Sequence, residues 1–237
     1  MNILLTNDDG VFSDGLQLLA KALRLGGKHR VIVAAPHINR SGVSHSLSIL
    51  HNPVKLALLE EDTWSCTGTP ADCVMAALKC ICPERPDLVI SGINHGENTG
   101  TDIVYSGTAA AARQASFSGI PALAFSLAGY KNHCWDMAVP WVLEHLEELK
   151  AIWRQDCFVN VNIPNREEGP AGMAMTWPAI KCYTDSLEMM NAPDGSRWCF
   201  LLPGQDKTVK QEGSDSDALS RNLVSVSLVY NYPIVRE

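Results

Sequence analysis

The sequence predicts an α/β fold in which helices sandwich a parallel sheet and a β-hairpin arm follows near the C-terminus. Two observations predict the sheet. Short apolar runs alternate with longer segments of helical period, and these runs lack the apolar/polar alternation of a half-exposed strand. A third observation predicts the arm, because a Pro-Asp-Gly turn at 193–195 lies between β-type segments.

The first strand–helix–strand unit lies at the N-terminus. Residues 2–6 (NILLT) form an apolar run of strand length that is closed by Asn, Asp and Gly. The helix expected over 15–25 has Ser13 or Asp14 as its N-cap, and its leucines repeat at helical spacing. A second apolar strand is expected over 30–35, so the helix connects two parallel strands.

The same alternation continues to residue 163. The further elements that we expect are helices over 71–80, 107–117 and 135–150 and strands over 87–91, 121–125 and 158–163.

From about Arg166 the pattern changes to alternating β-type segments, and a last strand is expected over 223–229 after a short helix near 217–221. We expect one domain over 1–237. Its parts are a core of about 1–165, an arm of about 166–212 and a C-terminal return over 213–237. Arms of this kind often pair with another subunit.

Composition excludes several functional classes. Hydrophobic residues make up 46% and charged residues 19% of the chain, as in ordinary globular proteins. No apolar run approaches the roughly 18 residues that cross a bilayer, and MNILLTNDDG has no signal-peptide pattern. We therefore expect a cytoplasmic protein with no membrane partner. The net charge of −7 argues against binding a nucleic acid duplex, but a small phosphorylated substrate remains compatible with it.

The eight cysteines are scattered, and no C-x-x-C pair occurs among them. Unpaired cysteines behave as small hydrophobic residues, so we expect buried free thiols rather than disulfides or a zinc site.

Two adjacent carboxylates, Asp8 and Asp9, follow the first predicted strand and precede Gly10. In open parallel sheets, ligands bind beyond the carboxyl ends of the strands. Adjacent carboxylates repel each other unless a cation or a proton lies between them, and hard divalent cations prefer oxygen ligands. The alternative is an ordinary turn, because Asp-Gly is a frequent turn pair.

Two later loops carry polar groups at the ends of the second and third predicted strands. Ser41 lies in the Asn-Arg-Ser-Gly loop, where a serine is more often an ordinary turn residue. Residues 92–100 (GINHGENTG) are expected to form a Gly/Asn-rich loop whose glycines do not match G-x-G-x-x-G. Its Asn94 could offer an amide oxygen to the same cation as the aspartates.

Ser106 is the expected N-cap of the alanine-rich helix 107–117. Free N–H groups in the first turn of a helix form an anion site, so Tyr105-Ser106-Gly107-Thr108 is a candidate phosphate cup. The alternative is a well-capped helix with no ligand.

Together these stretches resemble the SurE family of metal-dependent nucleotidases. The stretches that carry the resemblance are ILLTNDDG, NRSG, GTPADCV, SGINHGENTG, YSGT, GIPALAFS, VNVNIP and GSDSDAL followed by NLVSVS. The resemblance implies a Rossmann-like fold with an exchanged arm, giving homodimers or homotetramers. It also implies metal ligands at Asp8, Asp9, Ser41 and Asn94, and phosphate-binding residues at Asn98, Ser106, Gly107 and Thr108.

The activity implied is hydrolysis of nucleoside monophosphates, 5′- and possibly 3′-nucleotides, to nucleoside and phosphate. One divalent ion per subunit, Mg²⁺ or Mn²⁺, would activate a water molecule, with Asp8 or Asp9 as the proton acceptor. His45 and His95 lie near these motifs, but we assign no catalytic histidine.

The chain departs from the family pattern at His37, at Gln114-Ala115 and loosely over 172–212. A phospho-signalling receiver domain is disfavoured because no Lys follows PALAFS. A second alternative is an inactive scaffold that binds a partner through the arm.

Overall fold

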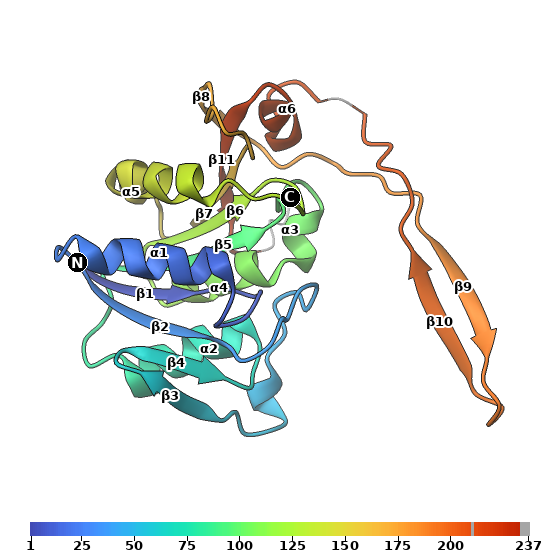
Figure 1. Cartoon of the computed structure of the whole chain (residues 1–237), viewed down its shortest axis with the longest axis horizontal. Helices are drawn as coiled ribbons and strands as arrows, with labels where there is room; N and C mark the ends of the chain where they lie inside the picture. The colour runs from blue at the N-terminus through green and yellow to red at the C-terminus, as the bar shows by residue number, and fades with distance from the viewer. Residues whose placement is uncertain (210, 233–237) are drawn as a thin grey trace, which may run out of the picture.

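The computed structural model describes residues 1–209 and 211–232. Nine strands form one mixed, mostly parallel sheet in the order β3-β4-β2-β1-β5-β6-β7-β11-β8 (Figure 1). The predicted parallel core is confirmed, because β2, β1, β5, β6 and β7 are all paired in parallel. These central strands are β1 (Asn2–Thr6), β2 (Arg30–Pro36), β5 (Leu88–His95), β6 (Ala122–Leu127) and β7 (Cys157–Ile163).

Helices cover both faces of the sheet, as predicted. One face packs against α1 (Asp14–Leu25) and α5 (Trp135–Ala151), and the other packs against α2 (Pro70–Ala76) and α4 (Gly107–Phe117). The two buried clusters explain the continuous apolar runs, because a strand covered on both sides has no face for polar residues.

Two predicted elements differ from the structure. The α-helix expected over 71–80 ends at Ala76, and the chain continues as a π-helical turn over Ala77–Ile81. The predicted loop over 92–100 is wrong in its first four residues, because β5 continues to His95. The register of β5 against β6 shifts between Ser91 and Asn94, so a bulge lets the strand run through the glycine-rich segment.

Near the edges of the sheet, the strand expected over 223–229 is confirmed, whereas the strands over 56–60, 63–66 and 172–176 were not predicted individually. On one side lies the antiparallel hairpin β3 (Leu56–Glu60) and β4 (Thr63–Cys66). On the other side, β11 (Leu223–Tyr230) pairs antiparallel with β7 and parallel with β8 (Gly172–Thr176). The short turns η1 (Ser48–Leu50) and α3 (Asp102–Tyr105) were also not predicted, whereas α6 (Asp215–Ser220) matches the expected short helix.

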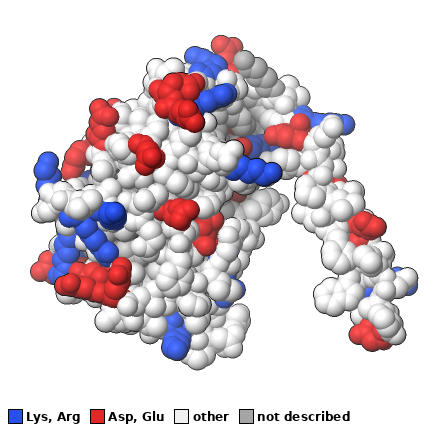
Figure 2. Space-filling model, in the orientation of Figure 1, with Lys and Arg blue, Asp and Glu red and all other residues white. Residues whose placement is uncertain are grey.

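The predicted hairpin is formed by β9 (Ser186–Asn191) and β10 (Arg197–Leu202), which among the described strands pair only with each other. It stands away from the rest of the molecule (Figure 1), and every residue of both strands is exposed. Much of the arm surface carries no charge (Figure 2). Position 210 of the predicted arm and positions 233–237 of the predicted return lie outside the described residues.

The cysteine prediction is correct for pairing and partly wrong for burial. All eight cysteines are free, but Cys80, Cys182 and Cys199 are exposed rather than buried. Over residues 1–209 and 211–232, no helix combines the length and apolar character needed to cross a membrane.

Candidate active site

Segments at the carboxyl ends of three strands meet the start of α4 around one cleft of about 250 Å³. Asp8 follows β1, Ser41 lies in the loop after β2, and Asn94 lies at the end of β5. The described residues that line the cleft are Asp8, Ser41, Gly42, Asn94, His95, Glu97, Asn98, Asp102, Tyr105, Ser106 and Tyr130. Five of the eight predicted metal- and phosphate-binding residues therefore line one cleft, namely Asp8, Ser41, Asn94, Asn98 and Ser106.

Asp8 is buried, with only 3% of its surface exposed. Burial raises the pKa of Asp8 to about 6, the hydrogen bond from the Thr108 hydroxyl opposes this rise, and the neighbouring Asp9 adds to it. Keeping this carboxylate ionised without a counter-charge is therefore costly. A cation within reach of Asp8 would offset that cost.

Asp9 is half-buried and is not among the residues that line the cleft. Its Oδ2 accepts a hydrogen bond of 3.0 Å from the backbone N–H of His95, which ties the end of β1 to the end of β5. Burial raises the pKa of Asp9, and the His95 N–H and the nearby His133 oppose the rise. Of the four predicted ligands, three line the cleft. The fourth, Asp9, directly follows the cleft residue Asp8 in the sequence.

Backbone contacts hold the other two predicted ligands in place. The Asn94 amide nitrogen donates to the Gly96 carbonyl over 2.8 Å, which leaves the amide oxygen for a ligand. Ser41 is exposed, and its N–H donates to Asn39 Oδ1 over 2.8 Å. The loop is also fixed to β1, because the Arg40 N–H donates to the Asp8 carbonyl over 2.7 Å.

The predicted phosphate residues surround the start of α4. The Ser106 hydroxyl caps the helix by accepting from the Ala109 N–H over 3.0 Å, as expected of an N-cap. A Cβ on Gly107 would lie 2.7 Å from the Asp8 Cβ, so only glycine lets the helix approach the carboxylate this closely. The Thr108 side chain is fully buried and bonds to Asp8 instead of lining the cleft.

Asn98 is held by two residues that the sequence analysis did not single out. Its N–H donates to Asn162 Oδ1 over 2.7 Å, and its carbonyl accepts from the Asn160 amide over 2.9 Å. Both partners are fully buried on β7. A possible signal was present, because two asparagines in the otherwise apolar run CFVNVNI require buried hydrogen-bond partners.

The donor set fits a hard cation. Within the part of the chain that the structure describes, no group of three or more His, Cys, Asp or Glu side chains could hold a metal ion. The predicted set instead combines two carboxylates with a hydroxyl and an amide oxygen, and oxygen ligands suit Mg²⁺ or Mn²⁺. The buried Asp8 carboxylate, with its raised pKa, is the feature that a bound divalent ion would stabilise.

Comparison with known proteins gives the family. The family model described as "Survival protein SurE" matches residues 3–185. The chain belongs to the SurE family. This membership confirms the resemblance seen in the motifs, and it excludes the receiver-domain alternative.

Other SurE proteins align along most of the chain. The 5′-nucleotidase SurE of Synechococcus elongatus is 39% identical, over 96% of this chain and 92% of that protein. The 5′-nucleotidase SurE of Thermosipho melanesiensis is 37% identical, over 96% of this chain and 90% of that protein. The crystal structure of the SurE protein from Aquifex aeolicus superposes with a TM-score of 0.85 at 34% identity, covering 99% of this chain and 95% of that one.

The two histidines near the SurE motifs have mainly structural contacts. His45 Nε2 lies 2.9 Å from Gln114 Oε1, and the ring stacks on Phe117. Burial lowers the pKa of His45. His95 lines the cleft and packs against His133 and Trp135, and burial followed by the charge of His133 lowers the pKa of His95.

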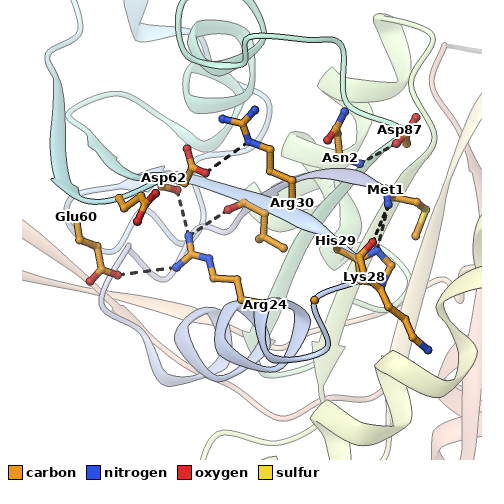
Figure 3. A pocket seen from close by; sticks show the side chains of 12 residues that line it. Met1, Asn2, Arg24, Lys28, His29, Arg30, Glu60, Asp62 and Asp87 are labelled. Carbon is orange, nitrogen blue, oxygen red and sulfur yellow. Dashed lines mark hydrogen bonds and ion pairs between the residues drawn. The ribbon is translucent and has the colours of Figure 1, made fainter.

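A second, wider hollow of this SurE chain lies at the opposite ends of the strands, where β1 and β2 begin (Figure 3). It measures about 960 Å³, but its arginines already have partners. Arg24 donates to the carbonyls of Val31 and Asp62 over 3.2 Å each, and Arg30 lies 3.6 Å from the Asp62 carboxylate. These charges stabilise the strand ends.

Proposed function

We propose that this chain is a 5′-nucleotidase that hydrolyses nucleoside monophosphates to nucleoside and phosphate. Its metal ligands in this proposal are Asp8, Asp9, Ser41 and Asn94, which would hold one Mg²⁺ or Mn²⁺ per subunit. The observation that carries the proposal is the cleft itself, where three strand ends bring oxygen donors beside the capped start of α4. The 5′-nucleotidase names of its SurE relatives support the same activity.

The residues of the chain would share the chemistry as follows. A bound divalent ion supplies polarisation of the phosphoryl oxygens and a water molecule of lowered pKa. Asp8 or Asp9 would act as the proton acceptor for the attacking water molecule. Asn98, the Ser106 hydroxyl and the first N–H groups of α4 would stabilise charge on the equatorial phosphoryl oxygens. Hydrolysis of 3′-nucleotides is a further part of the proposal.

The arm gives a second part of the proposal, namely assembly into a homodimer or homotetramer. An isolated two-stranded hairpin is at best marginally stable in water, so β9 and β10 need a partner surface. The hairpin also exposes large apolar side chains that a partner would cover, which are Leu187, Met189, Met190, Trp198, Phe200, Leu201 and Leu202. The cytoplasmic location expected from the sequence stays a prediction.

Phosphate release from a panel of nucleoside monophosphates, with and without added Mg²⁺ or Mn²⁺, tests the activity. We expect metal-dependent release that Asp8→Asn or Asp9→Asn abolishes while the protein stays folded by circular dichroism. Asp156→Asn is the matched control, because Asp156 makes an exposed ion pair with Arg154 at the start of β7. Wild-type rates in both site variants at saturating metal would contradict the proposal. Metal binding without release of phosphate would favour the scaffold alternative.

Light scattering coupled to gel filtration tests the assembly. Leu187 and Leu201 face each other in the hairpin register, so we expect Leu187→Glu combined with Leu201→Glu to give monomers. Leu25→Glu places the same charge on an exposed leucine outside the arm and should leave the assembly intact. A wild-type monomer would contradict this part of the proposal.

A further inference from the structure

Two tyrosines lie at the cleft beyond its polar groups. Tyr105 is the last residue of α3 and is 59% exposed, and Tyr130 follows β6 and is 76% exposed. Both line the same cleft as Asp8, Asn94 and Ser106. The tyrosines come from segments that are far apart in the sequence, so the fold alone brings them together.

Local contacts fix the position of Tyr130 although its ring is exposed. A Cβ on Gly96 would lie 2.4 Å from Tyr130 Cε1, so the ring rests directly on the backbone of Gly96. Gly96 has a φ of +100°, a conformation that favours glycine for a second reason. The neighbouring Gly129 is also held, because its N–H donates to Glu97 Oε2 over 2.8 Å and its carbonyl lies 2.9 Å from His133 Nε2.

Tyr105 is placed by the segment that carries the predicted phosphate site. It directly precedes the helix-capping Ser106, and its carbonyl accepts a hydrogen bond of 2.9 Å from the Ser44 N–H. An aromatic ring therefore lies one residue from the group that we expect to contact phosphate. A nucleotide bound through its phosphate at Ser106 would extend its base toward the tyrosine rings.

The two rings supply the large apolar surface of the cleft. Its other described lining residues are carboxylates, amides, serines, a glycine and His95, and none of them is aliphatic. Single exposed aromatic residues are normal on protein surfaces, but two in one polar cleft suit a ligand with one charged end and one flat apolar end. A nucleoside monophosphate is such a ligand.

We propose that Tyr130, together with Tyr105, binds the nucleobase of the substrate by stacking. This inference rests on the proposed function and adds to it the residues that distinguish a nucleotide from other phosphomonoesters. Every base has a π-face, so recognition by stacking tolerates different bases. The larger purine ring gains more contact, so Tyr130 should favour purine over pyrimidine nucleotides.

Steady-state kinetics with adenosine 5′-monophosphate and ribose 5-phosphate tests the inference, because the second compound lacks the base. Tyr130→Ala should raise KM for the nucleotide about tenfold and leave the kinetics of ribose 5-phosphate unchanged. Tyr130→Phe keeps the ring and should retain the wild-type KM. Tyr105→Ala should act in the same direction as Tyr130→Ala. Tyr230→Ala is the matched control, since Tyr230 is 49% exposed and pairs with Cys157 at the start of β7, far from the cleft end of the sheet.

The outcomes separate this inference from the proposed function. If the wild type hydrolyses the nucleotide but Tyr130→Ala changes both substrates equally, or neither, the stacking role is wrong. If the wild type hydrolyses neither substrate, the hydrolase proposal fails. Calorimetric binding of adenosine 5′-monophosphate to the same variants then decides the inference, which requires weaker binding by Tyr130→Ala and unchanged binding by Tyr130→Phe.

Discussion

The Thr108 hydroxyl donates a hydrogen bond to the Asp8 carboxylate and so joins the first turn of α4 to the end of β1. Both side chains are buried, so the bond is shielded from water. It holds the predicted metal ligand in one orientation, and Asp8 at the same time lines the cleft. This contact makes Thr108 a positioning residue for Asp8.

Removing the Thr108 hydroxyl should impair both stability and activity. Thr108→Val keeps the shape but leaves a buried carboxylate oxygen without its donor, which costs about 1.5–3 kcal/mol for a bond to a charged group. We expect a lower free energy of unfolding in urea and a lower kcat/KM for nucleotide hydrolysis. Thr108→Ser keeps the hydroxyl and should restore most of the activity. Equal activity of the Val and Ser variants would refute the positioning role.

A side chain at position 107 should displace Asp8. The Cβ of Gly107→Ala would lie 2.7 Å from the Asp8 Cβ and 3.0 Å from the Pro70 Cγ, and such overpacking costs about 1–3 kcal/mol. We expect a folded protein with a lower melting temperature and little phosphate release. Gly26→Ala is the matched control, since no atom of the described residues lies within 4 Å of a Cβ there and its φ of −71° suits alanine. Full activity of Gly107→Ala would show that Asp8 can move freely.

Asp72 gives a prediction for stability against pH. Burial would raise the pKa of Asp72, but hydrogen bonds from Ser48, Thr69 and Ile49 outweigh burial and lower it. A lowered pKa means that the carboxylate stabilises the fold above its unfolded pKa of about 4, and that this stabilisation is lost as the pH falls through the folded pKa. Asp72→Asn should therefore cost about 1–3 kcal/mol near neutral pH.

Urea unfolding of the wild type and Asp72→Asn at several pH values measures this effect. The difference between the two proteins should shrink as the pH falls below about 4. If the difference in unfolding free energy stays constant over this range, Asp72→Asn destabilises the fold through its shape and hydrogen bonding, and the charge of Asp72 is not the cause.

The segment that leads into the arm, which we call the root of the arm (residues 181–185), contacts Asp102 at the cleft. Lys181 Nζ lies 2.7 Å from Asp102 Oδ2, and the Tyr183 hydroxyl donates to the same carboxylate over 2.8 Å. Burial opposes the charge of Lys181, but the contact with Asp102 outweighs burial and raises the pKa of Lys181. We expect Lys181→Met to loosen this root and to speed chymotrypsin cleavage within the arm.

Arg154→Met is the control for that experiment, because it removes an ion pair whose two side chains are about half exposed. Exposed pairs contribute little to stability, so its cleavage rate should match that of the wild type. If both variants are cleaved equally fast, the Lys181 contact does not hold the arm.

Much of the core could be predicted from local pattern. The strand at 2–6 and the helix at 107–117 have the bounds that apolar runs and an N-cap serine indicate. The hairpin follows from its Pro-Asp-Gly turn in the same way. These elements are encoded locally, because strand length, helical period and turn chemistry are properties of neighbouring residues.

The edges of the sheet were not predictable in this way. β3 is an apolar run, LALLE, yet three of its five residues are exposed, so its place at the edge follows from its pairing with β4 rather than from burial. β8 becomes a strand only because β11 offers its backbone groups. Pairing with a distant segment decides such strands, and β propensity depends strongly on that context.

The sequence by itself determined which residues bear the chemistry, since carboxylates, amides and a capping serine follow apolar runs that can only be buried strands. Only the tertiary structure decided which of them meet. In the folded chain Thr108 bonds to Asp8, the backbone of Asn98 bonds to two asparagines of β7, and the Tyr130 ring packs on Gly96. The physical reason is that chemical type belongs to a residue alone, whereas a contact between distant residues exists only after the whole sheet has assembled.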